Sequence, residues 1–310
     1  MRRQRQCSEP GENAAGISTA GGCVPLQSWR LFMIHNTRYK IEKTIRIVIL
    51  WIVAGISLAP FYVMICYAFK SKEEFTKTGL DFPTSVNLQN FADALHLKNY
   101  INSIVNSAVV SVFVVLTIVI CCSSSAYIIT RKNNRFYNFI YYFFQMVILI
   151  PFQSIMFPLY QELSRAHFLN TLFGVILAEL GVYMGYYVFL YAGFVKSVPV
   201  ALEEAAEIDG CNRYQVYRKI VFPLLKPITM TVIVLCFLAS WNDFFLPLIL
   251  IQKDSMKTLP LMQFFFFGEY SSNVNLAFAA SMIALIPPTV IYFCAQKYIV
   301  AGMTAGAVKT

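Results

Sequence analysis

Six long runs of apolar residues constrain this chain more than any other feature of its sequence. A helix that crosses a bilayer needs about 20 mostly apolar residues, and each run reaches that length. Of the 310 residues, 57% are hydrophobic and only 13% are charged. Soluble globular proteins carry about 25% charged residues. We therefore predict an all-α integral membrane protein with six transmembrane helices. The expected spans are 47–69, 104–128, 136–160, 169–194, 228–251 and 276–295.

Prolines inside these runs would break helices in a soluble protein. In a membrane bundle, neighbouring helices can satisfy the carbonyls that a proline leaves free. We therefore expect kinks and not helix ends at these positions. They are Pro60, Pro151, Pro158, Pro247, Pro287 and Pro288.

Basic residues between the spans predict the orientation of the chain. Loops on the cytoplasmic side carry an excess of Lys and Arg. Eighteen of the 25 Lys and Arg residues lie in the N-terminal segment, the 131–135 and 196–227 gaps, and the C-terminal tail. Both termini and the long 196–227 gap are therefore expected in the cytoplasm.

Three segments follow from this reading. Residues 1–42 form an N-terminal cytoplasmic segment that we expect to be disordered, because its first 32 residues contain no apolar core. No hydrophobic stretch follows its first arginines closely enough for a signal peptide. Translation from Met33 is an alternative start. Residues 43–300 form the six-span domain, and 301–310 form a C-terminal cytoplasmic tail.

Composition and missing motifs argue against catalysis and metal binding. The formal net charge of +9 lies in the short gaps between apolar runs, so nucleic acid is not expected as a partner. No P-loop, H-E-x-x-H or G-x-S-x-G motif occurs. The eight cysteines form no C-x-x-C pair, and we expect those in apolar runs to be buried thiols. These are Cys66, Cys121, Cys122 and Cys236.

The 196–227 gap is predicted to form a helix, a glycine turn and a second helix. Pro199 suits the first turn of a helix, and Gly210 can end it in a left-handed conformation. Asn212 can cap the second helix with Gln215 three residues on, and that helix is expected to end at Val221.

Small residues follow one face of the first helix. Ala201, Ala205 and Ile208 recur at helical spacing and would let this face enter a groove of another protein. We expect Glu203, Glu204 and Glu207 to place charge on its rim. The alternative is a solvated amphipathic loop.

The same gap resembles a known motif. Glu204-Ala205-Ala206-x3-Gly210-x9-Ile220-x-Phe222-Pro223 is similar to the EAA loop of bacterial ABC importer permeases, E-A-A-x3-G-x9-I-x-L-P. The departure is Phe222, where the pattern has leucine. Because one large apolar side chain replaces another, the change is mild.

Further motifs resemble the carbohydrate-uptake branch, in particular the second, six-span permease of maltose-type systems. They are Asn102-Ser103, Ala126-Tyr127, Pro151-x-Gln153, Pro158-Leu-Tyr160, Thr171-Leu172, Trp241-Asn242-Asp243 and the ending from Ala295 to Lys309. The resemblance covers residues 43–310. It implies the type I ABC importer permease fold with a cytoplasmic coupling helix, and uptake of a sugar or oligosaccharide.

The resemblance also implies partners. These are a second permease subunit, two ATPase subunits that bind ATP and Mg, an extracytoplasmic solute-binding protein, and lipid of a bacterial cytoplasmic membrane. This chain itself would be non-catalytic and without a cofactor. The residue matching Glu204 pairs in the family with a basic residue of the ATPase, and the segment matching 302–309 reaches toward the ATPase pair. The coupling residues are expected to be Glu203, Glu204, Ala205, Ala206, Asp209, Gly210, Ile220 and Pro223.

Two ionisable residues, Glu179 and Asp243, lie inside predicted spans, and such residues usually face a bundle interior. Carboxylates accept hydrogen bonds from hydroxyls and aromatic rings stack on sugars, so a translocation path could include both together with Trp241, Asn242 and Tyr183. The alternative is that these residues fix contacts between helices or subunits.

Other functions remain open from the sequence. An ion-coupled secondary transporter would use several ionisable groups at the midplane and repeated halves, whereas we find two such groups and no repeat. An intramembrane enzyme would need a catalytic constellation within the spans. A non-transporting membrane scaffold would purify without an ATPase.

Overall fold

The structure is a computed structural model that describes residues 26–132, 134–269 and 273–307. Within these ranges the chain forms helices and no strand. It divides into two compact units, Met1–Pro60 and Phe61–Thr310, and each is described by itself.

The first helix, α1 (Leu26–Phe69), begins inside the segment for which the sequence predicts disorder. The helix runs from Leu26 because residues 26–42 contain neither glycine nor proline. The first 25 residues, and the expectation of disorder there, lie outside the described part. Within the first unit, side chains such as Leu50 and Trp51 are exposed, as expected for a span that contacts lipid.

Six spans match the structure when two bent helix pairs are each counted as one. Four helices are long and apolar enough alone: Glu42–Phe69 of α1, α4 (Tyr100–Arg131), α7 (Leu172–Val195) and the Val274–Gln296 part of α14 (Val274–Ala307). The pairs are α5 (Arg135–Leu149) with α6 (Phe152–Arg165), bent by 106°, and Arg213–Leu224 with α11 (Lys226–Trp241), bent by 74°.

Most of the prolines that the sequence places inside spans lie within helices, but one lies between two helices. Pro60, Pro158, Pro287 and Pro288 lie inside helices, as predicted. The expectation of a kink at Pro151 is wrong, because α5 ends before it and α6 starts after it. Ile150, which precedes the proline, has an extended conformation with ψ 118°, and clash with a following proline ring disfavours the helical one.

The predicted fifth span, 228–251, is also interrupted. α11 ends at Trp241, and a short α12 (Phe245–Leu250) follows. Asp243 Oδ1 accepts a hydrogen bond from the backbone N–H of Leu246 at 3.3 Å, which favours a new helix start here. A 3₁₀ turn (Asp254–Met256) and α13 (Leu259–Glu269) then occupy a gap for which the sequence predicts no helix.

The second unit is a bundle centred on α4. This helix packs against α7 and α11, α5 packs against α7, and α11 packs against α14. At Gly185 of α7 an added Cβ would lie 2.7 Å from the carbonyl oxygen of Phe144, so only glycine allows this approach of α5. Of the four cysteines expected to be buried, Cys121 is half-buried and the other three are buried.

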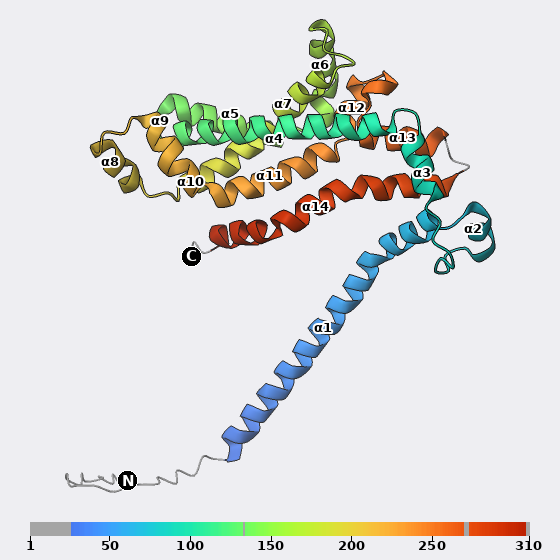
Figure 1. Cartoon of the computed structure of the whole chain (residues 1–310). Helices are drawn as coiled ribbons and strands as arrows, with labels where there is room; N and C mark the ends of the chain where they lie inside the picture. Colours follow the sequence, from blue (N-terminus) through green and yellow to red (C-terminus); the bar gives the residue numbers. More distant parts are fainter. Residues whose placement is uncertain (1–25, 133, 270–272, 308–310) are drawn as a thin grey trace. The chain divides into compact units, whose positions relative to one another are not determined.

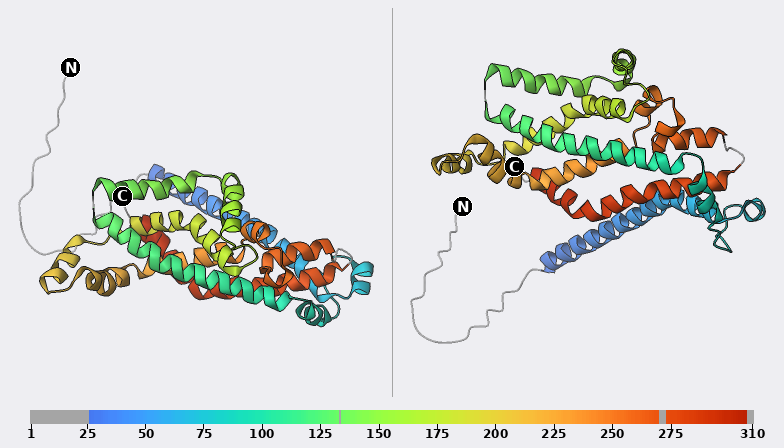
Figure 2. Two further views of the ribbon diagram at one scale, coloured as in Figure 1. Left: turned by 90° about the horizontal axis from the view of Figure 1, so that it is seen from above. Right: turned by 45° about the horizontal axis from the view of Figure 1, so that its top comes forward.

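Short helices lie at the two ends of the bundle (Figure 1). α2 (Lys72–Thr78) and α3 (Gln89–His96) lie at one end. α8 (Val200–Ile208), α9 (Arg213–Val216) and α10 (Phe222–Leu224) lie at the other, beyond the ends of α4 and α7, and both views of Figure 2 show the same arrangement.

Candidate functional site

The helix α8 and its glycine turn form as the sequence predicts. Pro199 is the N-cap, with ψ 127°, and α8 ends at Ile208 with Asp209 as C-cap. Gly210 has φ +84°, in the left-handed region. A Cβ at Gly210 would meet no atom within 4 Å, so backbone conformation and not space favours glycine here.

The second half of the loop starts as predicted and ends later. The side chain of Asn212 accepts from the Gln215 N–H at 2.9 Å, and the Gln215 side chain accepts from the Asn212 N–H at 2.9 Å. This capping box confirms the predicted helix start. The helix does not stop at Val221, because a π turn (Tyr217–Val221) leads directly into α10. Pro223 lies within α10 and is exposed, while Ile220 is half-buried.

The two faces of α8 differ in exposure. Ala201, Ala205 and Ile208 are exposed, and 86% of the Ile208 surface is accessible. Glu204 is exposed as well. On the opposite face Ala206 and Glu203 are buried. The expectation that Glu203 lies on the rim is therefore wrong: α8 presents Glu204 outward and turns Glu203 toward the bundle.

Glu203 is held by the end of α4. Its Oε1 lies 2.6 Å from Nη2 of Arg131 and accepts from Arg131 Nε at 2.8 Å, and its Oε2 accepts from the Tyr127 hydroxyl at 3.0 Å. Arg131 Nη2 also donates to the Val198 carbonyl at 2.8 Å. Removing one partner of a buried ion pair costs about 3–5 kcal/mol. The pair therefore fixes α8 against α4.

A third residue of α4 also contacts the loop. The Ser123 Oγ and the Tyr217 hydroxyl are 2.7 Å apart. Ser123, Tyr127 and Arg131 are spaced by four residues and so lie on one face of α4; we call them the α4 ladder. The ladder contacts α8 through Glu203 and the π turn through Tyr217, so both halves of the loop are attached to one span. Sequence reasoning missed the ladder, although polar residues at four-residue spacing near the end of an apolar run were visible.

An open cavity of about 530 Å³ is lined by residues of α4, α8, α9 and the π turn. Tyr127, Glu203, Glu204, Tyr214 and Tyr217 are among its lining residues. On its rim, Arg213 Nε and Glu207 Oε1 are 3.9 Å apart and both side chains are largely exposed. Exposed pairs of this kind contribute at most about 1 kcal/mol. Glu207 thus lies on the rim, as predicted, and is weakly held.

The polar residues inside the spans cluster around the interruption after α11. The Tyr183 hydroxyl donates to Asp243 Oδ2 at 3.2 Å, which links α7 to the interruption. Trp241 is buried, and its Nε1 donates to the Ala284 carbonyl of α14 at 3.3 Å. Asn242 is exposed and donates to the Leu238 carbonyl at 2.8 Å. Three of the five candidate path residues therefore link helices to one another.

Glu179 lies one turn before Tyr183 on α7 and is fully buried. Asp243 and Ser240 lie near it. Among the described residues, neither carboxylate oxygen of Glu179 makes a hydrogen bond. In contrast to Glu203, this buried glutamate has no arginine or lysine paired with it in the described part of the chain.

Comparison with known proteins identifies the family. The family described as "Binding-protein-dependent transport system inner membrane component" matches residues 118–305. The probable starch degradation products transport system permease protein AmyC of Thermoanaerobacterium thermosulfurigenes is 40% identical, over 81% of this chain and 92% of the relative. The melibiose/raffinose/stachyose import permease protein MelC of Bacillus subtilis (strain 168) is 34% identical, over 86% of this chain and 98% of the relative.

Solved structures share the fold. A chain of a bacterial ABC transporter involved in the import of the acidic polysaccharide alginate superposes with a TM-score of 0.74 at 22% identity, over 84% of this chain and 96% of that one. The residues matched by the family model, 118–305, include the α4 ladder and the loop that it anchors. The chain therefore belongs to the inner-membrane components of binding-protein-dependent transport systems.

Proposed function

We propose that this chain is a membrane-spanning permease subunit of an ATP-binding-cassette importer for a sugar or oligosaccharide. The cargo class is supported by relatives named for the transport of starch degradation products and of melibiose, raffinose and stachyose. The fold shared with an alginate transporter supports the same role.

The observation that carries this proposal is the division of α8 into a free face and an anchored face. Ala201, Ala205 and Ile208 are exposed beside Glu204, whereas Glu203 is paired with Arg131. A partner protein that binds the exposed face of α8 can therefore displace α8 and α4 together. Packed helices transmit such displacements as rigid bodies.

In this proposal, other subunits hydrolyse ATP and deliver the cargo. Two ATPase subunits bind ATP and Mg²⁺ and contact α8. A second permease subunit completes the path, and a solute-binding protein delivers the cargo from outside. This chain has no catalytic role and no cofactor. It lies in the cytoplasmic membrane of a bacterium, with α8 and both termini in the cytoplasm.

The residues around the interrupted fifth span are proposed to border the path. Asn242, whose side chain is exposed, is the one expected to reach the cargo. Trp241, Tyr183 and Asp243 hold the interruption in place through the contacts described above.

Substitution of Glu204 by alanine tests the proposal. The variant should assemble normally, because Glu204 is exposed and makes no ion pair with the described residues. Substrate-stimulated ATP hydrolysis and uptake should fall by about thirtyfold or more, since loss of one member of a charge pair at an interface costs about 2 kcal/mol or more. Purified transporter in proteoliposomes provides both measurements.

Glu207→Ala is the matched control, because Glu207 lies one turn along α8 in a weak exposed pair. It should change both rates by less than about threefold. Unchanged coupled uptake in Glu204→Ala would contradict the proposal. Uptake that survives ATP depletion but stops with an uncoupler would instead identify an ion-coupled carrier.

A further inference from the structure

The loop between α2 and α3, residues 79–88, leaves large apolar side chains uncovered. Four of them are at least half exposed: Leu80, Phe82, Val86 and Leu88. The exposed residues of α2, directly before this loop, are instead mostly charged and include Lys72, Glu73 and Lys77. Several exposed apolar side chains in one segment mark contact with a protein or with lipid.

Two contacts place Leu80 beside α1 and not beyond its end. The Tyr62 hydroxyl donates to the Leu80 carbonyl at 2.8 Å, and the Cys66 thiol lies 3.6 Å from the same oxygen. Tyr62 and Cys66 precede the end of α1 at Phe69 by seven and three residues, hence by about 10 and 5 Å along the helix axis. Side chains of a helix point toward its N-terminus, which here leads away from Phe69. The 79–88 loop therefore folds back along α1, to a level inside the candidate span Glu42–Phe69.

The start of α14 gives a second measure of this level. The rings of Tyr67 and Phe278 stack with centroids 4.6 Å apart, and Nδ2 of Asn275 donates to the Tyr67 carbonyl at 2.9 Å. The last turn of α1 is therefore level with the first turns of the α14 span. Tyr62, which holds Leu80, precedes Tyr67 by more than one turn. Leu80 thus lies inside the level at which both spans end.

Polar contacts hold the 79–88 loop in this position at both of its ends. Nζ of Lys70, which is fully buried, donates to the carbonyl of Gly79 and to the hydroxyl of Thr78, each at 2.9 Å. At the other end the Asn87 N–H donates to the Phe69 carbonyl at 2.9 Å. The uncovered apolar side chains therefore belong to a loop whose backbone is fixed against the end of α1.

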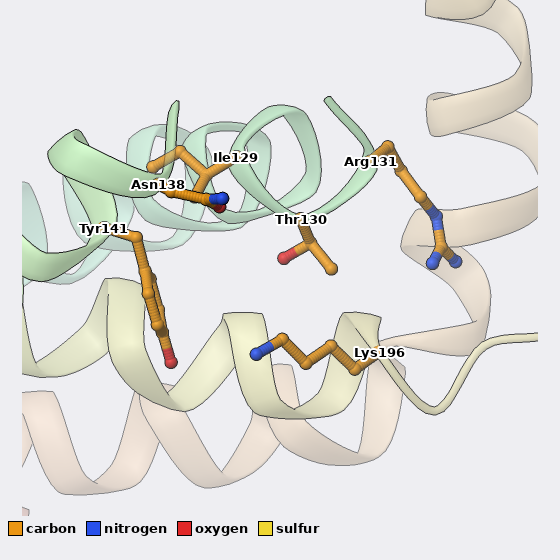
Figure 3. A pocket seen from close by; sticks show the side chains of 6 residues that line it. All are labelled: Ile129, Thr130, Arg131, Asn138, Tyr141 and Lys196. Carbon is orange, nitrogen blue, oxygen red and sulfur yellow. The ribbon is translucent and has the colours of Figure 1, made fainter. Parts of the chain in front are cut away.

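Side chains at the opposite end of the bundle are arranged differently. Figure 3 shows that Thr130, Tyr141 and Lys196 point into the space between α4, α5 and α7. Nζ of Lys196 lies 5.1 Å from the centroid of the Tyr141 ring. Polar and aromatic groups there contact one another, whereas Leu80 and Phe82 remain exposed and available to a partner.

The depth of the 79–88 loop favours lipid as that partner. A protein from the aqueous phase approaches from beyond the ends of the spans, whereas Leu80 lies beside α1 within its span. Phe61 and Tyr62, on this part of α1, are themselves about half exposed, so the loop continues an exposed apolar surface. Aromatic and apolar side chains gather where a membrane meets water.

We propose that the 79–88 loop enters the interfacial region of the bilayer and contacts lipid through Leu80 and Phe82. The charged face of α2 stays in water. The orientation given under the proposed function assigns this contact to the outer leaflet, but the contact itself does not depend on that function. The loop then sets the level of the end of α1 relative to the membrane surface.

Photocrosslinking in the complete transporter tests this contact. p-Benzoylphenylalanine replaces Phe82, and the transporter with its copurifying subunits is placed in proteoliposomes of phosphatidylethanolamine and phosphatidylglycerol, with the solute-binding protein added. After irradiation, the intact mass of this chain identifies what has been attached to it. Lipid adducts should exceed those at a control position by about tenfold, which corresponds to about 1.4 kcal/mol and to the lower end of the gain from burying a phenylalanine side chain.

Glu73 is the matched control position, because it is exposed on the charged face of α2, shortly before the same loop. p-Benzoylphenylalanine there should give few lipid adducts. Equal lipid adducts at positions 73 and 82 would overturn the proposed depth of the loop. An adduct of position 82 with the solute-binding protein or with the second permease subunit would overturn the proposal in favour of a protein-docking surface. The absence of any adduct would overturn it in favour of contact with water.

Quenching by brominated phospholipids measures the depth without a crosslinker. Phe82→Trp adds an indole to the loop, and the fluorescence of the three native tryptophans is subtracted with the wild-type protein. The added fluorescence should be quenched more strongly by bromine near the headgroup end of the acyl chain than by bromine near its tail. Thr76→Trp, at an exposed position of α2, should be quenched by neither. Quenching of Phe82→Trp that is no stronger than that of Thr76→Trp would exclude insertion of the loop.

Discussion

Two buried glutamates, Glu203 and Glu179, differ in whether a basic side chain balances their charge. Glu203, at the water-facing end of the bundle, is buried against Arg131 and Tyr127 and holds α8 in place. Glu179, within α7, is buried more completely and has no basic partner in the described part. Near water, a buried carboxylate can be paired with a long basic side chain that reaches it from a neighbouring helix end.

The contrast teaches that burial alone does not identify the important acid. A paired buried charge fixes one geometry, because loss of either partner leaves the other charge uncompensated. When a buried carboxyl without a basic partner is replaced, no opposite charge is left uncompensated. We therefore expect the two glutamates to respond very differently to substitution.

The largest expected effect is that of Glu203→Ala. It leaves the Arg131 guanidinium in a site where only 17% of its side chain is exposed, and should lower the free energy of unfolding by about 3 kcal/mol. Uptake should fall sharply at the same time, because α8 loses its attachment to α4. Thermal unfolding in detergent and uptake in proteoliposomes measure the two effects.

A charge exchange provides the sharper version of this test. Arg131→Glu combined with Glu203→Arg should recover part of the stability that either single variant loses, and the non-additive part measures the coupling between the two residues. A Glu203→Ala variant that is no less stable than Glu207→Ala would refute the anchoring role of the ladder.

A smaller effect is expected from Glu179→Gln. The amide preserves the shape of the side chain, and the charged form of a carboxyl is expensive within a membrane. The free energy of unfolding should therefore change by less than about 1 kcal/mol. Glu203→Gln, measured in parallel, should lose more stability because it weakens the interaction with Arg131. The reverse order would show that the comparison between the two glutamates is wrong.

The smallest effect concerns a third carboxylate, Glu74 of α2, which is stabilised by hydrogen bonds and lies outside the spans. The side chain and backbone N–H of Thr84 donate to Glu74, at 2.7 and 2.8 Å, and lower its pKa below the ordinary 4.5. A lowered pKa stabilises the folded loop above pH 4.5, and this contribution is lost as the pH falls further.

Hydrogen exchange of the loop between α2 and α3 at pH 7 and pH 4 measures this contribution after correction for the intrinsic exchange rate. Wild-type protection should weaken at the lower pH. In Glu74→Gln the protection should be lower at neutral pH and should depend less on pH. An identical pH dependence in the variant would rule out Glu74 as the titrating group.

Features that depend on neighbouring residues were predictable. The apolar runs mark the spans because their length is set by the bilayer. The capping box of Asn212 and Gln215 and the left-handed Gly210 were also predicted, since each depends on backbone conformation within a few residues. The exposed face of α8 follows from helical spacing.

Features that depend on residues far apart in the sequence could not be predicted. The partner of Glu203 lies 72 positions earlier in the chain, on a helix whose packing the α8 sequence does not contain. The sharp bend at Pro151 and the interruption after Trp241 also differ from the predicted continuous spans, because a proline or an Asn-Asp pair is compatible with either a kink or a break.

The sequence by itself determined the membrane class, the approximate spans and the helix–turn–helix of the coupling loop, all of which arise from local periodicity and backbone preference. Only the tertiary structure decided which glutamate of α8 faces the bundle and which span the loop is attached to. Those outcomes depend on the packing of α4 against α7 and the adjoining loop, and no short stretch of the chain encodes that packing.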